Sequence, residues 1–147
     1  MSLGIGDVSS TLLKRLQDNW DTSVAQLVYD NTEKPDAEPS DFTTPWIRAT
    51  INPLSTRNTV LGYGYRLRGI LNIQIFTAQG IGEGAAQDIF DALAILMQNL
   101  QLETLQSNGC IFTYAATPVR VGEGIRRVDQ IERGWYQLNC EINWEAQ

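Results

Sequence analysis

The chain has 147 residues, 43% of them hydrophobic and 19% charged, so it can bury one core of its own, and no shift in composition suggests a second domain. Its net charge of −6 argues against a nucleic-acid-binding surface, because affinity for phosphate backbones comes mostly from clustered Lys and Arg. The sequence has no histidine, which removes the usual general base and the commonest metal ligand and so lowers the expectation of an enzyme.

The N-terminus lacks the basic region, apolar block and cleavage site of a signal peptide, and no apolar stretch approaches the roughly 20 residues that span a bilayer. Cys110 and Cys140 are too few for a disulfide framework, and their spacing matches no zinc or redox motif. We expect both to be buried as small apolar residues. We also expect a protein made and kept in a cytosol, with no cofactor and no membrane contact.

The first third of the chain predicts one helix, one short strand and a long acidic loop. Apolar residues at helical spacing, namely Leu12, Leu13, Leu16 and Trp20, indicate a helix from about Asp7 to Asn19. A short strand follows from about Val24 to Tyr29. The long loop at about 31–44 overlaps the stretch from Thr32 to Pro45, which has three prolines and four acids against one lysine and cannot bury enough apolar surface to form a regular element.

Two strands with alternating faces are predicted next. In the first, from Pro45 to Leu54, one face carries Ile47, Ala49 and Ile51, and the other carries Arg48, Thr50 and Asn52. In the second, Leu67, Gly69, Leu71, Ile73 and Ile75 alternate with polar residues that include Arg66, Arg68, Asn72 and Gln74. Each strand therefore has one buried face and one polar face.

The second half predicts a helix followed by strands. An amphipathic stripe of Ile89, Phe90, Leu93, Leu96, Met97 and Leu100 indicates a helix packed on a sheet. A strand from Cys110 to Thr117 leads to Pro118, and residues 118–134 are expected to form a long charged connection. The final strand alternates Tyr136, Leu138, Cys140, Ile142 and Trp144 with polar residues.

This order of elements predicts an α+β fold with two layers. One-sided alternation favours a mostly antiparallel or mixed sheet, with the N-terminal helix and one long amphipathic helix packed on one face. We expect residues 1–147 to form a single domain with long loops at about 31–44 and 118–134.

The glycine-rich stretch between the second of these strands and the amphipathic helix resembles a phosphate-binding loop. Gly80, Gly82 and Gly84 form G-x-G-x-G, which lacks the spacing of the dinucleotide fingerprint and the lysine of a Walker motif. Glu83 would oppose a phosphate at the helix entrance. A turn joining a strand to a helix is therefore favoured over nucleotide binding.

Paired carboxylates offer a second alternative. Asp88 and Asp91, and likewise Glu141 and Glu145, are residue types that bind metals or act as acid and base. Each pair lies where the periodicity already requires polar residues, so solvated faces are the favoured explanation.

Charge is segregated on the predicted loops. The acidic arm includes Glu33, Asp36 and Glu38, whereas positive charge gathers at Arg57, Arg66, Arg68, Arg120, Arg126, Arg127 and Arg133. Tyr65 and Arg66 belong to a stretch that could stack with nucleic acid, but salt bridges to an acidic protein surface suit this acidic chain better. We expect contacts between identical subunits, with the acidic arm on a basic patch, although ordinary solvated loops remain the alternative.

The motifs "LVYDN", "PWIRATI", "GILNIQIF" and a G-x-G turn into an alanine-rich amphipathic helix occur in this order. In this, the chain resembles the tail terminator family of long-tailed bacteriophages, which includes proteins similar to lambda-type minor tail protein U. The resemblance runs from about Leu12 to Leu100. The residues carried over by position are Tyr29, Asn31, Pro45, Trp46, Arg48, Gly69, Gly80 and Gly82, which it implies are scaffold residues.

The resemblance implies a small α+β protein that forms a homo-hexameric ring on the end of the phage tail tube, stops polymerisation of the tube and presents a surface to the head connector. It implies a protein of the virion that is assembled in the bacterial cytoplasm, with no reaction and no cofactor. DNA would pass through the ring without specific binding. The alternatives are another neck or head-tail completion protein, a nucleotide or small-ligand module using Gly80 to Gly84, and an enzyme working with carboxylates alone.

Overall fold

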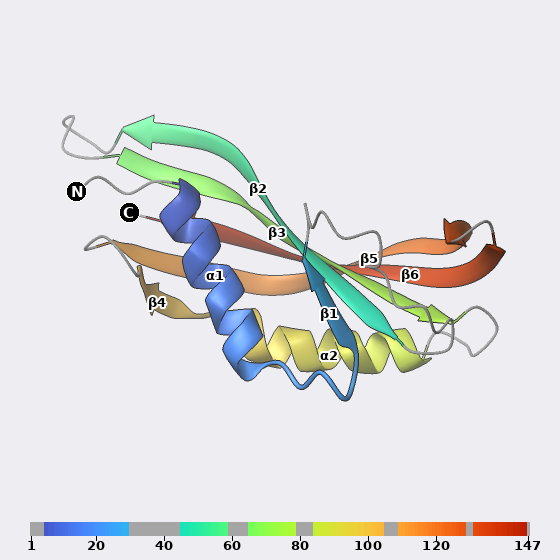
Figure 1. Cartoon of the computed structure of the whole chain (residues 1–147). Coiled ribbons are helices and arrows are strands. Elements are labelled where there is room, and N and C mark those ends of the chain that lie inside the picture. Colours follow the sequence, from blue (N-terminus) through green and yellow to red (C-terminus); the bar gives the residue numbers. More distant parts are fainter. Residues whose placement is uncertain are drawn as a thin grey trace.

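The computed structural model of the chain describes residues 5–29, 45–58, 65–78, 84–104, 109–128 and 131–146 (Figure 1). These residues form two helices and a six-stranded sheet with the strand order β1-β2-β3-β6-β5-β4. The elements are α1 (Ile5–Asn19), β1 (Gln26–Tyr29), β2 (Trp46–Asn58), β3 (Tyr65–Ala78), α2 (Gly84–Met97), β4 (Gln101–Glu103), β5 (Cys110–Val128) and β6 (Ile131–Ala146). β1 pairs with β2 in parallel and every other pairing is antiparallel, so the predicted α+β class with a mixed sheet is confirmed.

The two central strands have the faces that their alternation predicts. In β3, Leu67, Leu71, Ile73 and Ile75 are buried, whereas Arg68 is exposed. In β6, Tyr136, Leu138, Cys140, Ile142 and Trp144 are buried. These side chains join apolar residues of both helices in one core cluster. Because the side-chain period of a strand is two, the register between β3 and β6 places all of these residues on one face.

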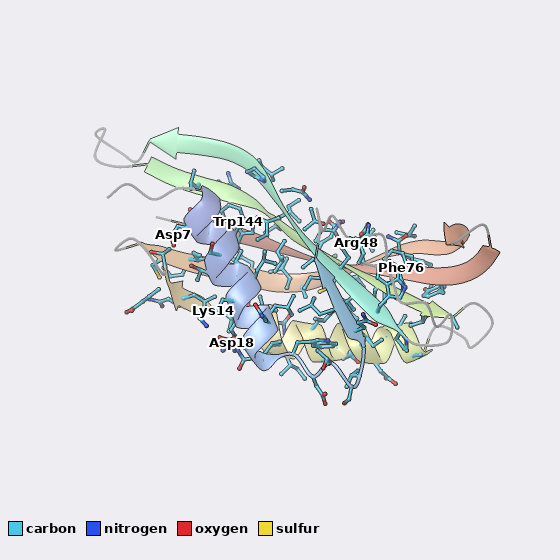
Figure 2. All side chains as sticks on the ribbon, in the orientation of Figure 1. Asp7, Lys14, Asp18, Arg48, Phe76 and Trp144 are labelled. Carbon is cyan, nitrogen blue, oxygen red and sulfur yellow. The ribbon has the colours of Figure 1, made fainter. Side chains whose placement is uncertain are left out.

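Helix α1 contributes Val8, Leu12 and Leu16 to the core, as its helical spacing predicts. Its outer side carries a salt bridge of 2.8 Å between Lys14 and Asp18, one turn apart (Figure 2). The chain leaves the helix at Trp20, whose indole N–H donates to the carbonyl oxygen of Ala25 at 2.8 Å. This bond directs the chain toward β1.

Helix α2 is shorter than its apolar stripe predicts. We expected Leu100 on the helix, but the helix ends at Met97, and Gln101–Glu103 form the strand β4 beside β5. Asn99 has a φ of 53°, a left-handed conformation that asparagine tolerates better than most residues. The hydroxyl of Thr113 donates to the carbonyl oxygen of Met97 at 2.7 Å and accepts from the N–H of Leu100 at 2.8 Å. The hydroxyl of Thr113 in β5 thus bonds both the last residue of α2 and the residue just before β4.

The expected long connection at 118–134 is also wrong. β5 continues through this region to Val128, and β6 begins at Ile131, so the two strands form a long hairpin. Pro118 is the register partner of Cys140, within β5. A proline is tolerated there because β4 pairs only with residues 110–112, so beyond them the edge of β5 that faces away from β6 adjoins no strand among the described residues.

The sheet carries two hairpin arms that extend in opposite directions, the β2–β3 arm and the β5–β6 arm (Figure 1). The register explains this arrangement. Leu67, near the start of β3, is opposite Ala146 at the end of β6, whereas Ala78 is opposite Trp135 near the start of β6. The ends of β2 and β3 at Asn58 and Tyr65 therefore lie at one end of the sheet, and those of β5 and β6 at Val128 and Ile131 lie at the other.

Candidate functional site

The arginines predicted to form an interface are divided between the two arms. Arg57 and Arg66 are register partners in the β2–β3 arm. Arg126 and Arg133 are register partners in the β5–β6 arm, where Arg127 is opposite Glu132. Side chains of these five residues lie outside the described set. The sequence therefore identified charged positions, but the fold places them at two ends of the sheet and not in one patch.

Two predicted interface arginines have described side chains, and both are exposed. Arg68 lies on β3, opposite Glu145 of β6 in the register. Arg120 lies on β5, opposite Leu138. The acidic residues Glu33, Asp36 and Glu38 lie outside the described residues, so the expected contact between the acidic arm and a basic patch stays a prediction.

The residues carried over from the family resemblance include one well-defined aromatic contact. Trp46 stacks on Phe76 with ring centroids 4.1 Å apart and planes inclined by 13°, and the guanidinium carbon of Arg48 lies 5.2 Å from the Trp46 ring centroid. Trp46 is 0% exposed and Phe76 is 2% exposed, yet neither belongs to the core cluster that contains both helices. Alternation places them on the sheet face opposite to Ile47 and Ile75. The predicted polar face of β2 thus contains a second apolar contact, which the sequence reasoning missed.

The other scaffold residues have simpler positions. Tyr29 is the last residue of β1, and the carbonyl oxygen of Pro45 accepts a hydrogen bond of 3.0 Å from the N–H of Gln26. Gly69 lies in β3 as the register partner of Trp144. Asn31, Gly80 and Gly82 lie outside the described residues.

A cavity of about 370 Å³ lies between α2 and the β5–β6 hairpin. Helix α2 contributes Gln87, Phe90 and Asp91 to its walls, and the hairpin contributes Pro118, Arg120, Tyr136 and Leu138. Tyr136 and Leu138 are buried, whereas Asp91 and Arg120 are exposed at the rim. The cavity therefore has an apolar floor and charged groups of both signs beside it. The sequence did not reveal it, because Pro118 was expected to end the strand that forms one wall.

A second cavity of about 260 Å³ lies between β2, β3, β5 and β6. Its walls include Leu54, Arg68, Tyr114, Trp144 and Glu145. The hydroxyl of Tyr114 donates to the Glu145 carboxylate at 2.9 Å. This cavity borders the β2–β3 arm, at the other end of the sheet from the first.

The exposed side of α2 is acidic with one apolar residue. Asp88, Asp91 and Ile95 follow one another at helical spacing, and Ile95 is 80% exposed. Among the described residues neither aspartate has an ion-pair partner. The predicted solvated face of this helix therefore carries two acids, of which Asp91 shares the lining of the first cavity with Arg120 of β5.

The two cysteines differ in environment. Cys140 is fully buried, and burial, followed by the nearby Glu141 charge, raises the pKa of its thiol to about 12. Cys110 is only half-buried, so the expectation that both are buried holds for Cys140 alone. In the described ranges, no three His, Cys, Asp or Glu side chains come together as metal ligands.

Comparison with known proteins shows the fold and no activity. No family model and no curated protein sequence matches this chain. One solved structure, whose name describes no activity or partner, is similar to it with a TM-score of 0.67 and 17% sequence identity, over 99% of this chain and 97% of the other. Neither helix in the described part of the chain is long and apolar enough to cross a bilayer.

Proposed function

We propose that the chain is a structural protein of a phage virion, a tail terminator that forms a ring on the end of the tail tube, stops tube polymerisation and offers a surface to the head connector. The proposal rests on the resemblance in motif order. The described elements follow one another in the order that this resemblance implies, namely helix, strands, helix and strands. We also propose that the fold has two layers, with one long amphipathic helix packed on the sheet.

The observation that carries the proposal furthest is the pair of oppositely directed hairpin arms, each with two arginines at opposed register positions. The two ends of one subunit are formed by different segments, β2 and β3 at one end and β5 and β6 at the other, so they are unlike surfaces. Contacts between unlike surfaces repeat from copy to copy and close into a ring when the rotation allows it. Its partners would be further copies of itself, the tail tube protein and the connector, with DNA passing through an acidic ring without specific binding.

Sedimentation of the purified chain, alone and with tail tube protein, tests this proposal. We expect a ring on the tube end that electron microscopy resolves, and an arrest of further tube growth. A chain that stays monomeric at every concentration and forms no ring with tube protein would contradict it.

Two alternative functions make different predictions. Another neck or head-tail completion protein would form a ring that binds the connector and leaves tube growth unchanged. A nucleotide module using the Gly80 to Gly84 loop would release or absorb heat with micromolar ATP or NAD in calorimetry. We expect no such heat, because the loop has no cation to bind a phosphate.

A further inference from the structure

The outermost strands of the sheet are short and leave long edges uncovered. β1 pairs with residues 46–49 of β2, and β4 pairs with residues 110–112 of β5 (Figure 1). Among the described residues, the outer edges of β2 at 50–58 and of β5 at 113–128 therefore adjoin no strand. Such an edge has backbone N–H and C=O groups that can pair with a strand of another molecule.

These two edges also carry exposed apolar side chains. Leu54 of β2 is 65% exposed, and Tyr114 and Val121 of β5 are 48% and 55% exposed. A long exposed edge with apolar side chains is a site at which copies of a protein aggregate by extending each other's sheets. A stable monomer or a closed ring therefore needs features that prevent this pairing.

Each uncovered edge has a proline soon after the short outer strand stops. Pro53 lies in β2 opposite Gly69, and Pro118 lies in β5 opposite Cys140. Both prolines are exposed. Proline has no backbone N–H, so each position lacks a donor that an added strand would need. The central strands β3 and β6 contain no proline.

The register shifts of the described sheet lie in the same two strands. At the centre of the sheet, β3 pairs with β6 along residues 67–78 without a shift. β2 has one shift, which leaves Leu54 without a register partner, and β5 has two, of which the second leaves Val121 without one. Gly122, just after it, has a φ of 104°, far from an extended conformation. An extra residue breaks the even spacing of the backbone groups and twists the strand locally.

The last part of β5 is protected by charge. Beyond Gly122 this strand carries Glu123, Arg126 and Arg127. Charged residues on an edge strand oppose the addition of another strand. Two adjacent arginines would also repel the same run of a second copy.

We infer that the free edges of β2 and β5 are built to prevent copies of this chain from joining their sheets. Short outer strands, a proline on each edge and register shifts confined to these strands act together. Copies of the chain then contact each other through side chains, and not through backbone pairing at these edges. The inference does not depend on the proposed ring, because a monomer needs the same protection.

Restoring the missing backbone donors tests this inference. The variant P53T/P118T replaces both exposed prolines by threonine, which has a backbone N–H and favours strands. Each restored N–H can form a hydrogen bond between copies, so we expect the midpoint concentration of self-association to fall about tenfold or more. Sedimentation velocity should show species that keep growing with concentration, unlike a closed ring of one size, and thioflavin T fluorescence should rise.

Pro45→Thr is the matched control. Pro45 precedes β2, and its carbonyl oxygen, which accepts from the N–H of Gln26, is kept by threonine. This variant should sediment like the parent. Near-UV circular dichroism shows which variants are folded. Each edge proline is also changed alone, and deletion of Leu54 removes one register shift by a different route, which should likewise promote association.

The inference fails if the folded edge variants associate like the parent, or if Pro45→Thr associates as strongly as they do. Neither result bears on the proposed function, which depends on whether the parent chain caps tail tubes. A parent chain that forms no ring would contradict that function and leave the inference about the edges in place.

Discussion

Gly69 of β3 lies directly against the indole ring of Trp144, its register partner on β6. A Cβ atom built at Gly69 would lie 2.5 Å from the carbonyl oxygen of Asn52 and closer still to the Trp144 ring. Trp144 is 1% exposed and belongs to the core cluster. Because the glycine has no side chain, the tryptophan ring can pack directly against the neighbouring strand. Figure 2 labels Trp144 and Phe76, which lie toward opposite ends of the sheet.

We predict that Gly69→Ala lowers the free energy of unfolding by about 1–3 kcal/mol, the usual cost of forcing an extra carbon into a packed core. Urea denaturation measures it. Gly6→Ala is the matched control, because no atom lies within 4 Å of a Cβ at that exposed helical position, and helix propensity favours alanine there. In a Trp144→Leu background the Gly69→Ala cost should shrink, since contacting residues are not additive. An equal cost in both backgrounds would show that the indole ring is not the obstacle.

Thr113 is predicted to stabilise the end of α2. Thr113→Val keeps the shape of the side chain but removes the hydroxyl that bonds Met97 and Leu100, leaving the buried carbonyl of Met97 without this donor. We expect a loss of about 1–3 kcal/mol in the free energy of unfolding. Thr117→Val, at an exposed position of the same strand, should change stability by less than about 0.5 kcal/mol. Equal effects of the two substitutions would contradict the role of Thr113.

Cys140 makes the fold sensitive to alkali. The folded chain keeps this thiol protonated up to a pKa of about 12, whereas the unfolded thiol ionises at about 9.0. The contribution of Cys140 to stability is therefore complete below pH 9 and is lost as the pH rises from 9 to 12, at about 1.4 kcal/mol per pH unit. Denaturation of the parent and of Cys140→Ala between pH 8 and 11 measures this, with a shallower decline expected for the variant. Parallel curves would mean that other groups cause the alkaline loss.

Reversal of Arg126 and Arg127 to Glu is predicted to weaken assembly while the monomer stays folded. The positions lie near the end of the β5–β6 arm, where Arg126 is opposite Arg133 and Arg127 is opposite Glu132. Positive charge at a strand end is suited to an acidic surface of another subunit. Sedimentation and far-UV circular dichroism of R126E/R127E measure assembly and fold. Unchanged assembly would remove this arm from the subunit interface.

Local periodicity was enough to predict the elements that face one core. Leu71 and Ile73 in β3, and Leu138 and Ile142 in β6, are buried as their alternation requires, and Leu12 and Leu16 are buried as helical spacing requires. A strand turns every second side chain to one face, and a helix turns every third or fourth. The residues of the buried face can therefore be recognised from the spacing of apolar residues close together in the sequence. The order of helices and strands and the α+β class followed from the same signal.

Other features depended on residues far apart in the chain. The apolar stripe of α2 continues to Leu100, but the helix ends at Met97. There the hydroxyl of Thr113, on strand β5, bonds the carbonyl oxygen of Met97 and the N–H of Leu100. Pro118 looked like a strand breaker, but it lies in β5, whose open edge tolerates a proline. The stack of Trp46 on Phe76 likewise needed the pairing of β2 with β3.

The candidate site belongs to this second group. The sequence alone determined which arginines and acids the chain has, that its net charge is negative, and that no histidine is present for catalysis. The tertiary structure decided that the arginines lie in two arms at opposite ends of the sheet, and that Asp91 and Arg120 flank one cavity. Strand register and helix packing set these distances, and both arise from pairings between segments that no local pattern encodes.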